Sequence, residues 1–320
     1  MRVFSRKLMP TNTYKGLRSY ELENDVIKIT FLPDYACKIA SLVHKKTGRE
    51  FLFQAKEETL RLPPYAAPFS QYDSSGFDEV FPSIDECPYP DGSFKGILIP
   101  DHGEVWAMKW QTVFSPENSQ VKAVVQSQKL PYIFSRTVTL KDNQVFFEYC
   151  VQNTAEEDFK FIWTPHCLLA CSPATRLLIP KNLTQVMTVE HSSRHLGPWG
   201  TRHPYPVTQD ENGQPFDLAA TEPASAQTCE KFYFTAPNSE GWCGIEHTDS
   251  GEQLIYQYDA EKVPYLGVWK TQGGYRGDYN IALEPCTGIY DDLYAANKIR
   301  RVAVVGPKGS YTWKFSMKIL

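Results

Sequence analysis

Apolar and polar residues alternate over many short stretches of this chain, a pattern that predicts β-strands with one buried face. The alternation is clearest over 120–126, 134–140 and 144–153, and the turn Lys141-Asp-Asn between the last two stretches predicts a hairpin. Further strands are expected at 26–32, 38–44, 231–235, 241–247, 252–258, 265–270, 279–284, 301–305 and 310–320. Helical periodicity is scarce, and the best candidate is one or two turns over 55–62.

Many short strands with turn residues between them favour an all-β fold, a large antiparallel β-sandwich. Val, Ile, Thr and a 13% share of aromatic residues fit such sheets. The composition shifts once, over about 189–226, where Pro, Gly, His, Gln and Thr gather. We therefore expect a single domain over 1–320 with one long loop excursion at 189–226.

Charge and composition argue against some classes of binding partner. The 37 acidic residues exceed the 33 basic ones, so no basic field attracts nucleic acid. No apolar run approaches the ~18 residues of a membrane span. The first residues lack the apolar core of a signal peptide, so we expect a cytoplasmic protein whose eight scattered cysteines are thiols.

Three residues are candidates for a catalytic site. His102 lies in the turn Pro-Asp-His-Gly, and His166 follows Pro165 inside an apolar run, where its ring needs a partner. Glu284 ends an apolar strand before Pro285, which we expect to stop the strand and leave the carboxylate at the sheet rim. Each residue alone could also have a purely structural role. Either histidine could be a hydrogen-bonded core residue, and Glu284 could be a solvated strand end.

Two other groups of residues are weaker candidates for a functional site. His191, His195 and His203 lie close in sequence, but the residues between them do not sustain a helix, so we predict a solvated loop and no metal site. The glycine-rich segment 273–277 lacks phosphate-loop spacing and predicts a hairpin turn.

Together the three segments resemble the galactose mutarotase (aldose 1-epimerase) family. The chain carries His102-Gly103, Thr164-Pro165-His166 and Leu283-Glu284-Pro285 in the family's order. The stretch 76–84, Gly-Phe-Asp-Glu-Val-Phe-Pro-Ser-Ile, and the stretch 265–269, Tyr-Leu-Gly-Val-Trp, are also similar to family segments. The resemblance extends over 20–320 and implies the family's β-supersandwich and an isomerase acting on a sugar.

The resemblance also implies roles for the three residues. Glu284 would be the base on the C1 hydroxyl, and His166 the acid at the ring oxygen, which requires its imidazole to hold a proton near neutral pH. His102 would be a second donor that orients the sugar. The implied reaction is acid–base ring opening and reclosure, which requires no cofactor and no metal.

Three further residues are candidates for sugar binding. Trp269 offers a stacking ring, or is ordinary core packing. Asp78 could accept hydrogen bonds from sugar hydroxyls, or cap a loop. Trp199, in the long excursion, could close over the site.

Departures from the family pattern leave alternatives open. The Asn-His-x-Tyr-Phe-Asn stretch of typical galactose mutarotases is replaced here by Trp163-Thr-Pro-His-Cys-Leu-Leu. One alternative is a carbohydrate-binding protein without turnover. Another is an epimerase of a phosphorylated or modified hexose, in which Arg276 would meet the anionic group. The expected partner is a small-molecule sugar, with no nucleic acid and no membrane, in a monomer or homodimer.

Overall fold

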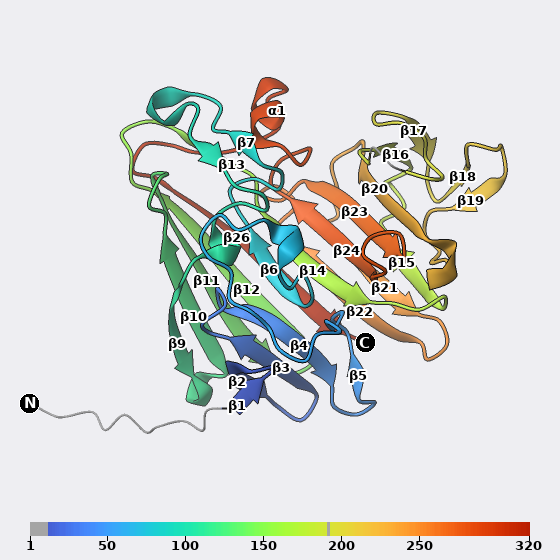
Figure 1. Cartoon of the computed structure of the whole chain (residues 1–320), viewed down its shortest axis with the longest axis horizontal. Coiled ribbons are helices and arrows are strands. Elements are labelled where there is room, and N and C mark those ends of the chain that lie inside the picture. The colour runs from blue at the N-terminus through green and yellow to red at the C-terminus, as the bar shows by residue number, and fades with distance from the viewer. Residues whose placement is uncertain (1–11, 191–192) are drawn as a thin grey trace, which may run out of the picture.

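A computed structural model describes residues 12–190 and 193–320, and its regular structure is almost entirely β-strand. Two large antiparallel sheets form a sandwich (Figure 1), which confirms the predicted fold class. The first sheet has twelve strands within the described residues: β1 (Asn12–Tyr14), β2 (Leu17–Glu23), β3 (Ile27–Leu32), β4 (Lys38–His44), β6 (Phe77–Val80), β14 (Thr164–Ala170), β24 (Tyr279–Cys286), β23 (Tyr265–Gln272), β20 (Thr228–Phe234), β16 (Gln185–Thr188) and β17 (Arg202–Pro204) in spatial order, with β5 (Arg49–Glu50) paired to β4.

The second sheet has eight strands in the described part of the chain: β15 (Thr175–Leu178), β21 (Trp242–His247), β22 (Glu252–Tyr258), β26 (Ser310–Ile319), β12 (Gln144–Asn153), β11 (Tyr132–Lys141), β10 (Gln120–Gln126) and β9 (Gln111–Ser115). Small pairs join β7 (Cys87–Pro88) to β8 (Leu98–Ile99), β13 (Phe159–Phe161) to β25 (Ala303–Val305), and β18 (Val207–Gln209) to β19 (Pro215–Asp217). The helical elements are short: α1 (Leu293–Lys298), η1 (Phe69–Gln71), η2 (Gly92–Phe94), η3 (Val105–Ala107), η4 (Pro116–Asn118) and η5 (Ala224–Ala226).

Burial along the strands explains where the period-two pattern is visible. Strands β10, β11 and β12 alternate buried and more exposed residues, because one face packs on the core and the other meets solvent. Strands β14 and β24 are buried along almost their whole length. Both faces of these central strands are covered, so their sequences are largely continuous apolar runs with few polar residues.

Aromatic side chains fill the space between the sheets. The rings of Phe77 and Phe147 lie 5.5 Å apart, and those of Trp163 and Trp313 lie 5.1 Å apart. Glu79 points into this layer, where its carboxylate accepts hydrogen bonds at 2.8 Å from Arg136 and from the Trp163 indole. Because successive strand residues point to opposite faces, the neighbouring Asp78 points to the other side of the sheet.

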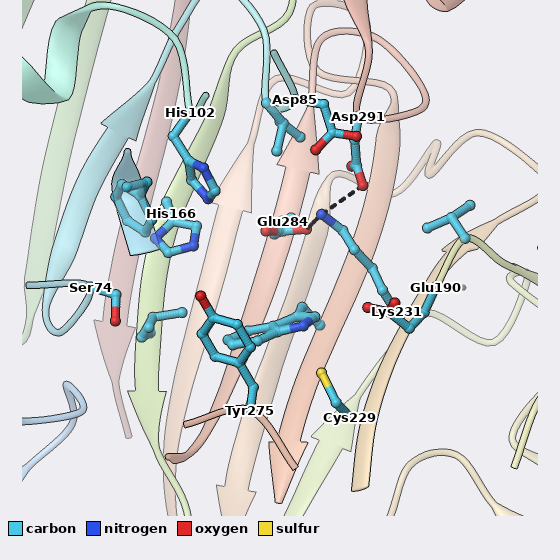
Figure 2. A pocket seen from close by; sticks show the side chains of 15 residues that line it. Ser74, Asp85, His102, His166, Glu190, Cys229, Lys231, Tyr275, Glu284 and Asp291 are labelled. Carbon is cyan, nitrogen blue, oxygen red and sulfur yellow. Dashed lines mark ion pairs between the residues drawn. The ribbon is translucent and has the colours of Figure 1, made fainter. Parts of the chain in front are cut away.

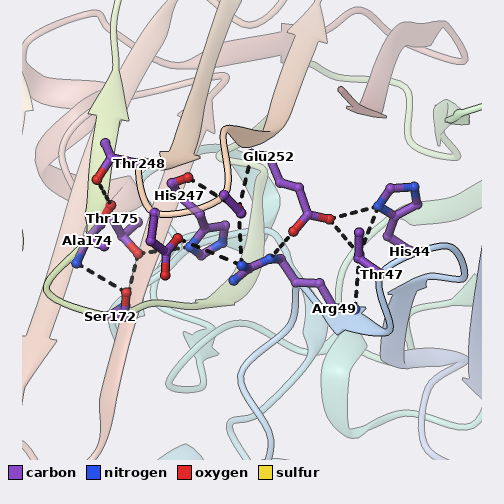
Figure 3. A network of polar contacts seen from close by, with 11 residues as sticks. His44, Thr47, Arg49, Ser172, Ala174, Thr175, His247, Thr248 and Glu252 are labelled. Atoms are coloured by element: carbon purple, nitrogen blue, oxygen red, sulfur yellow. Dashed lines mark hydrogen bonds and ion pairs between the residues drawn. The ribbon is translucent and has the colours of Figure 1, made fainter.

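A polar network ties the edges of the two sheets together (Figure 3). Glu252 on β22 accepts hydrogen bonds from Thr47 at 2.6 Å and Arg49 at 2.5 Å, and its Oε1 lies 2.8 Å from His44 Nδ1. Burial alone would raise the pKa of Glu252, but the bonds from His44, Thr47 and Arg49 lower it to about 2. The β4–β5 hairpin of the first sheet is thereby fixed to the second sheet.

Two expectations about irregular segments were wrong. The 55–62 segment is irregular and not helical, and Lys15 donates to the carbonyls of Ala55 and Glu57 at 2.6 and 2.7 Å, so these carbonyls are engaged outside any helix. The 189–226 excursion, yellow in Figure 1, contains β17 and the β18–β19 hairpin instead of being structureless. Lys270 on β23 anchors it through the carbonyls of Leu218 and Ala220 at 2.9 and 3.0 Å.

The expected hairpin turn and the expected thiols were confirmed. Segment 273–277 lies in the turn between β23 and β24, where the Gly273 amide donates to the Asp278 carbonyl at 2.9 Å. All eight cysteines are free thiols. Within residues 12–190 and 193–320, no helix has the length and apolarity needed to cross a membrane.

Candidate active site

A cavity of about 360 Å³ lies on the face of the first sheet that is turned away from the second (Figure 2). His166, Trp269, Lys231 and Glu284 enter it from β14, β23, β20 and β24, whereas their neighbours in sequence face the core between the sheets. The cavity is lined by Phe69, Ser74, Ile84, Asp85, His102, His166, Leu168, Val189, Glu190, Cys229, Lys231, Trp269, Tyr275, Glu284 and Asp291. The structure therefore brings four of the predicted site residues together: His102, His166, Trp269 and Glu284.

Glu284 lies on the cavity floor and is 1% exposed. The prediction that Pro285 ends the strand at the sheet rim was wrong, because β24 continues to Cys286 and Pro285 pairs with Leu266 of β23. Pairing with β14 stops at Ala282, so on that side no neighbour requires the amide hydrogen that proline lacks. Glu284 is thus held inside a buried strand.

One ammonium group stands between Glu284 and a second carboxylate. Lys231 Nζ lies 2.9 Å from Asp291 Oδ2 and 3.4 Å from Glu284 Oε2. Burial raises the pKa of Glu284, and the Lys231 charge opposes that rise. Burial would lower the pKa of Lys231, but Asp291 and then Glu284 raise it above its usual range, so the side chain is an ammonium. Tyr233 donates to Asp291 Oδ1 at 2.5 Å and fixes that carboxylate in turn.

His166 faces the cavity with a ring that is 6% exposed, and among the described residues its Nδ1 has no hydrogen-bond partner. Burial lowers its pKa well below the usual value, and the charges of His102, Lys231 and Lys38 lower it further. This lowered pKa favours the neutral imidazole, which argues against the expectation that His166 holds a proton near neutral pH.

His102 packs beside His166 at the cavity wall. Its ring stacks on Phe69 at 3.8 Å between centroids and meets the His166 ring edge-on at 5.0 Å. His102 adopts a left-handed backbone with φ of 60°, and Gly103 follows at φ of 73°, where a Cβ would lie 2.1 Å from the Phe81 carbonyl oxygen. The tight turn therefore requires the glycine and directs His102 inward.

A carboxylate supports the His102 ring from behind. His102 Nδ1 lies 2.7 Å from Asp101 Oδ1. Burial would raise the pKa of Asp101, but the hydrogen bond from His102 lowers it below its usual value. Asp101 is therefore ionised and orients the ring, leaving Nε2 for a ligand.

Aromatic rings form another wall of the cavity. Trp269 and Tyr275 lie edge-to-face with centroids 5.7 Å apart. Figure 2 shows Tyr275 at the cavity, with its hydroxyl on the side of His166. Such rings provide apolar faces against which a pyranose can pack.

Two predicted binding residues lie elsewhere. Asp78 does not line the cavity; its carboxylate is buried against Lys38 Nζ at 2.6 Å, and burial raises its pKa to about 6 although Lys38 opposes the rise. Trp199 is 48% exposed and packs on Tyr290 with centroids 5.6 Å apart, outside the cavity lining. Asp78 faces the same side of the sheet as His166, its register partner in the β6–β14 pair, but its carboxylate binds Lys38 outside the cavity lining.

The two histidines of the long excursion that the structure describes, His195 and His203, have separate partners. His195 Nε2 lies 3.1 Å from Glu222, and His203 contacts the Thr208 hydroxyl and the Leu196 carbonyl. His191 falls outside the described residues.

Comparisons with known proteins complete the description of the fold. The family model of a domain of unknown function, DUF5107, matches residues 6–93. No curated protein matches the sequence. The Slr1438 protein of Synechocystis sp. PCC 6803 is similar in structure, with 16% identity, a TM-score of 0.72, and coverage of 98% of this chain and 99% of that one.

Two further solved structures carry functional names. A candidate aldose 1-epimerase of Escherichia coli K12 has 16% identity, a TM-score of 0.69, and coverage of 94% and 98% of the two chains. A galactose mutarotase related enzyme of Lactobacillus acidophilus has 15% identity, a TM-score of 0.66, and coverage of 94% and 97%. At such identities the likeness establishes the fold. The chain has the galactose mutarotase-like fold.

The sequence did not indicate four residues that line the cavity, Lys231, Asp291, Asp85 and Tyr275. Lys231 carried the clearest signal, since it opens the apolar run Lys-Phe-Tyr-Phe, where a charge must find a buried partner. Arg276, considered for an anionic sugar group, does not line the cavity and donates instead to the Ser70 carbonyl at 2.9 Å.

Proposed function

We propose that this chain is an aldose 1-epimerase that interconverts the α and β anomers of an uncharged aldose. The observation that supports this most strongly is a buried carboxylate, Glu284, in the same cavity as two imidazoles, His102 and His166 (Figure 2). The cavity volume of about 360 Å³ suits a ligand of one sugar unit.

The reaction needs one base and one proton donor. Glu284 takes the proton of the C1 hydroxyl while the bond between C1 and the ring oxygen breaks, and the ring oxygen gains a proton. The resulting aldehyde turns about the C1–C2 bond, and the reverse transfers close the ring on the other face. Protons are only exchanged, so the atoms balance without a further reactant.

The imidazole pair provides the proton donor. His102 is the member whose Nδ1 is held by a carboxylate, that of Asp101, which leaves Nε2 for the sugar, so we assign the transferred proton to it. His166 donates or accepts a hydrogen bond that holds the sugar. This reverses the division of roles that the family resemblance implies.

Unsatisfied buried groups favour turnover over simple binding. Among the described residues, His166 Nδ1 is buried without a hydrogen-bond partner, and Glu284 Oε2 is buried with Lys231 beside it at 3.4 Å. Incompletely satisfied buried polar atoms cost free energy, and a sugar hydroxyl in the cavity would provide a partner for both. A binding site alone would not require an acid–base pair at this cost.

The charges of the cavity favour an uncharged sugar over a phosphorylated or acidic one. Four carboxylate side chains line it, those of Asp85, Glu190, Glu284 and Asp291, against one ammonium, Lys231, which is already paired. A phosphate there would meet repulsion without an available cation.

Anomer exchange measured by NMR tests the proposal, with neutral, acidic and phosphorylated aldoses compared on the purified protein. We expect acceleration for a neutral aldose, reduced by at least ~10²-fold in Glu284→Gln, since a positioned base contributes about that much. Exchange at the buffer rate for every sugar, together with shifted sugar resonances, would instead indicate a carbohydrate-binding protein.

A further inference from the structure

Lys231 reaches the floor of the cavity from a strand that does not adjoin Glu284. It lies on β20, which is separated from β24 by β23, and its side chain crosses β23 to reach both carboxylates. The side chains of Lys231, Glu284 and Asp291 are 13%, 2% and 12% exposed. Solvent therefore screens this group of three charges only weakly.

The two carboxylates compete for this one ammonium. Asp291 is the closer, at 2.9 Å, and it also has the Tyr233 hydroxyl. Glu284 has Lys231 at 3.4 Å as its ion-pair partner in the described part of the chain. Two carboxylates this close in a dry site do not both ionise unless a cation offsets their repulsion.

The other charged and titratable groups around Glu284 do not replace that cation. Those lining the cavity are Asp85, His102, His166, Glu190, Cys229 and Tyr275. Asp85 and Glu190 are carboxylates, which add negative charge. The His166 imidazole is neutral because its pKa is lowered. Burial raises the pKa of Cys229 to about 11, so the thiol is uncharged at neutral pH. His102 also lowers the pKa of Glu284, but less than Lys231 does, and its ring is held by its own carboxylate, Asp101.

We propose that Lys231 is the positioning residue that keeps Glu284 a carboxylate and aims it at the C1 hydroxyl. This inference rests on the proposed epimerase function. A protonated Glu284 has no capacity to accept the hydroxyl proton, so loss of Lys231 impairs the reaction through Glu284 while the other walls of the cavity stay in place.

The pH profile of kcat tests this role with two variants that should shift its acidic limb in opposite directions. Lys231→Met removes the ammonium and should move the acidic limb of kcat up by at least about one pH unit, the lower range for a lost opposite charge. Asp291→Asn removes the competing carboxylate and should move the same limb down. Lys231→Arg keeps the charge and should keep the limb close to that of the wild type.

A direct titration separates this inference from the proposed function. In protein labelled with ¹³C at glutamate Cδ, the resonance lost in Glu284→Gln identifies Glu284, and its midpoint is compared between wild type and Lys231→Met. A higher midpoint in Lys231→Met supports the inference even if no sugar is turned over, in which case the epimerase proposal alone fails.

Other outcomes overturn the inference. An active wild type whose limb and Glu284 midpoint are unmoved in Lys231→Met would show that Lys231 does not act through Glu284. A raised KM with an unmoved limb would show instead that Lys231 binds a sugar hydroxyl directly. Circular dichroism confirms that each variant is folded before these comparisons are made.

Discussion

Gly267 faces Glu284 across the β23–β24 pair, and a methyl group on Gly267 would lie 3.3 Å from Glu284 Oε2. The same methyl group would come 2.9 Å from the ring of Tyr233. The missing side chain thus leaves room for the carboxylate and for the phenol that supports Asp291. A backbone position between two functional side chains is therefore part of the site.

Gly267→Ala is expected to lower both stability and turnover. The added methyl group overpacks a buried position, which costs about 1–3 kcal/mol of unfolding free energy, and it displaces Glu284 so that kcat falls more than KM changes. Guanidinium unfolding and anomer exchange measure the two effects. Gly306→Ala is the matched control, because nothing lies within 4 Å of a Cβ there. Equal behaviour of the two variants would contradict the assigned crowding.

The neutral state of His166 predicts how stability depends on pH. Its folded pKa lies well below its unfolded value of about 6.5, so the unfolded chain takes up a proton first as the pH falls. The contribution of neutral His166 to the unfolding free energy is therefore full above about pH 6.5. Below that pH it declines by up to about 1.4 kcal/mol per pH unit. His166→Gln removes this term, so the stability of the variant should fall less between pH 6.5 and 5. Denaturant titrations at each pH measure the difference, and parallel curves would show that His166 is protonated in the folded protein.

Glu252→Gln tests the network that joins the sheets. Hydrogen bonds to a charged group contribute about 1.5–3 kcal/mol to stability. The variant should therefore lose about 2 kcal/mol of unfolding free energy at pH 7. The folded pKa of about 2 lies below the unfolded value, so this stabilisation is full above about pH 4.5 and is lost as the pH falls toward 2. The unfolding curves of wild type and variant should converge over that range. Anomer exchange should stay at the wild-type rate, since Glu252 does not line the cavity.

Asp78→Asn distinguishes a structural carboxylate from a sugar ligand. Removing one partner of a buried ion pair costs about 3–5 kcal/mol, and the loss here should lie at the lower end because Lys38 keeps Asp73 at 3.2 Å. The KM for the sugar should not change. Asp34→Asn is the surface control, since its pair with Arg18 is exposed and worth about 0–1 kcal/mol. A raised KM in folded Asp78→Asn would restore the sugar-binding role that the sequence suggested.

Local patterns predicted the fold well because alternation and turn residues act within a strand and its neighbour. The bounds predicted for 38–44, 120–126, 144–153 and 252–258 agree with β4, β10, β12 and β22. The helix expected at 55–62 is not formed, and a distant side chain, Lys15, engages two carbonyls of that segment.

The site could be predicted only where a motif marked it. His102, His166 and Glu284 carried recognisable neighbours in sequence, and the structure places them in one cavity. Lys231 and Asp291 acquire their importance from strand order, which places β20 two strands from β24. Asp78 and Glu79 are adjacent in sequence yet serve opposite faces, and which face holds the cavity depends on how the sheets stack.

The pairing of β14 with β24 brings the middle of the chain to its C-terminal part, and the cavity forms along that seam. The meander of β9 to β12, by contrast, consists of neighbours in sequence. Contacts between distant segments form slowly because a long loop must close first. The cavity should therefore form late in refolding, after the meander, so that recovery of the proposed epimerase activity would report completion of the whole architecture.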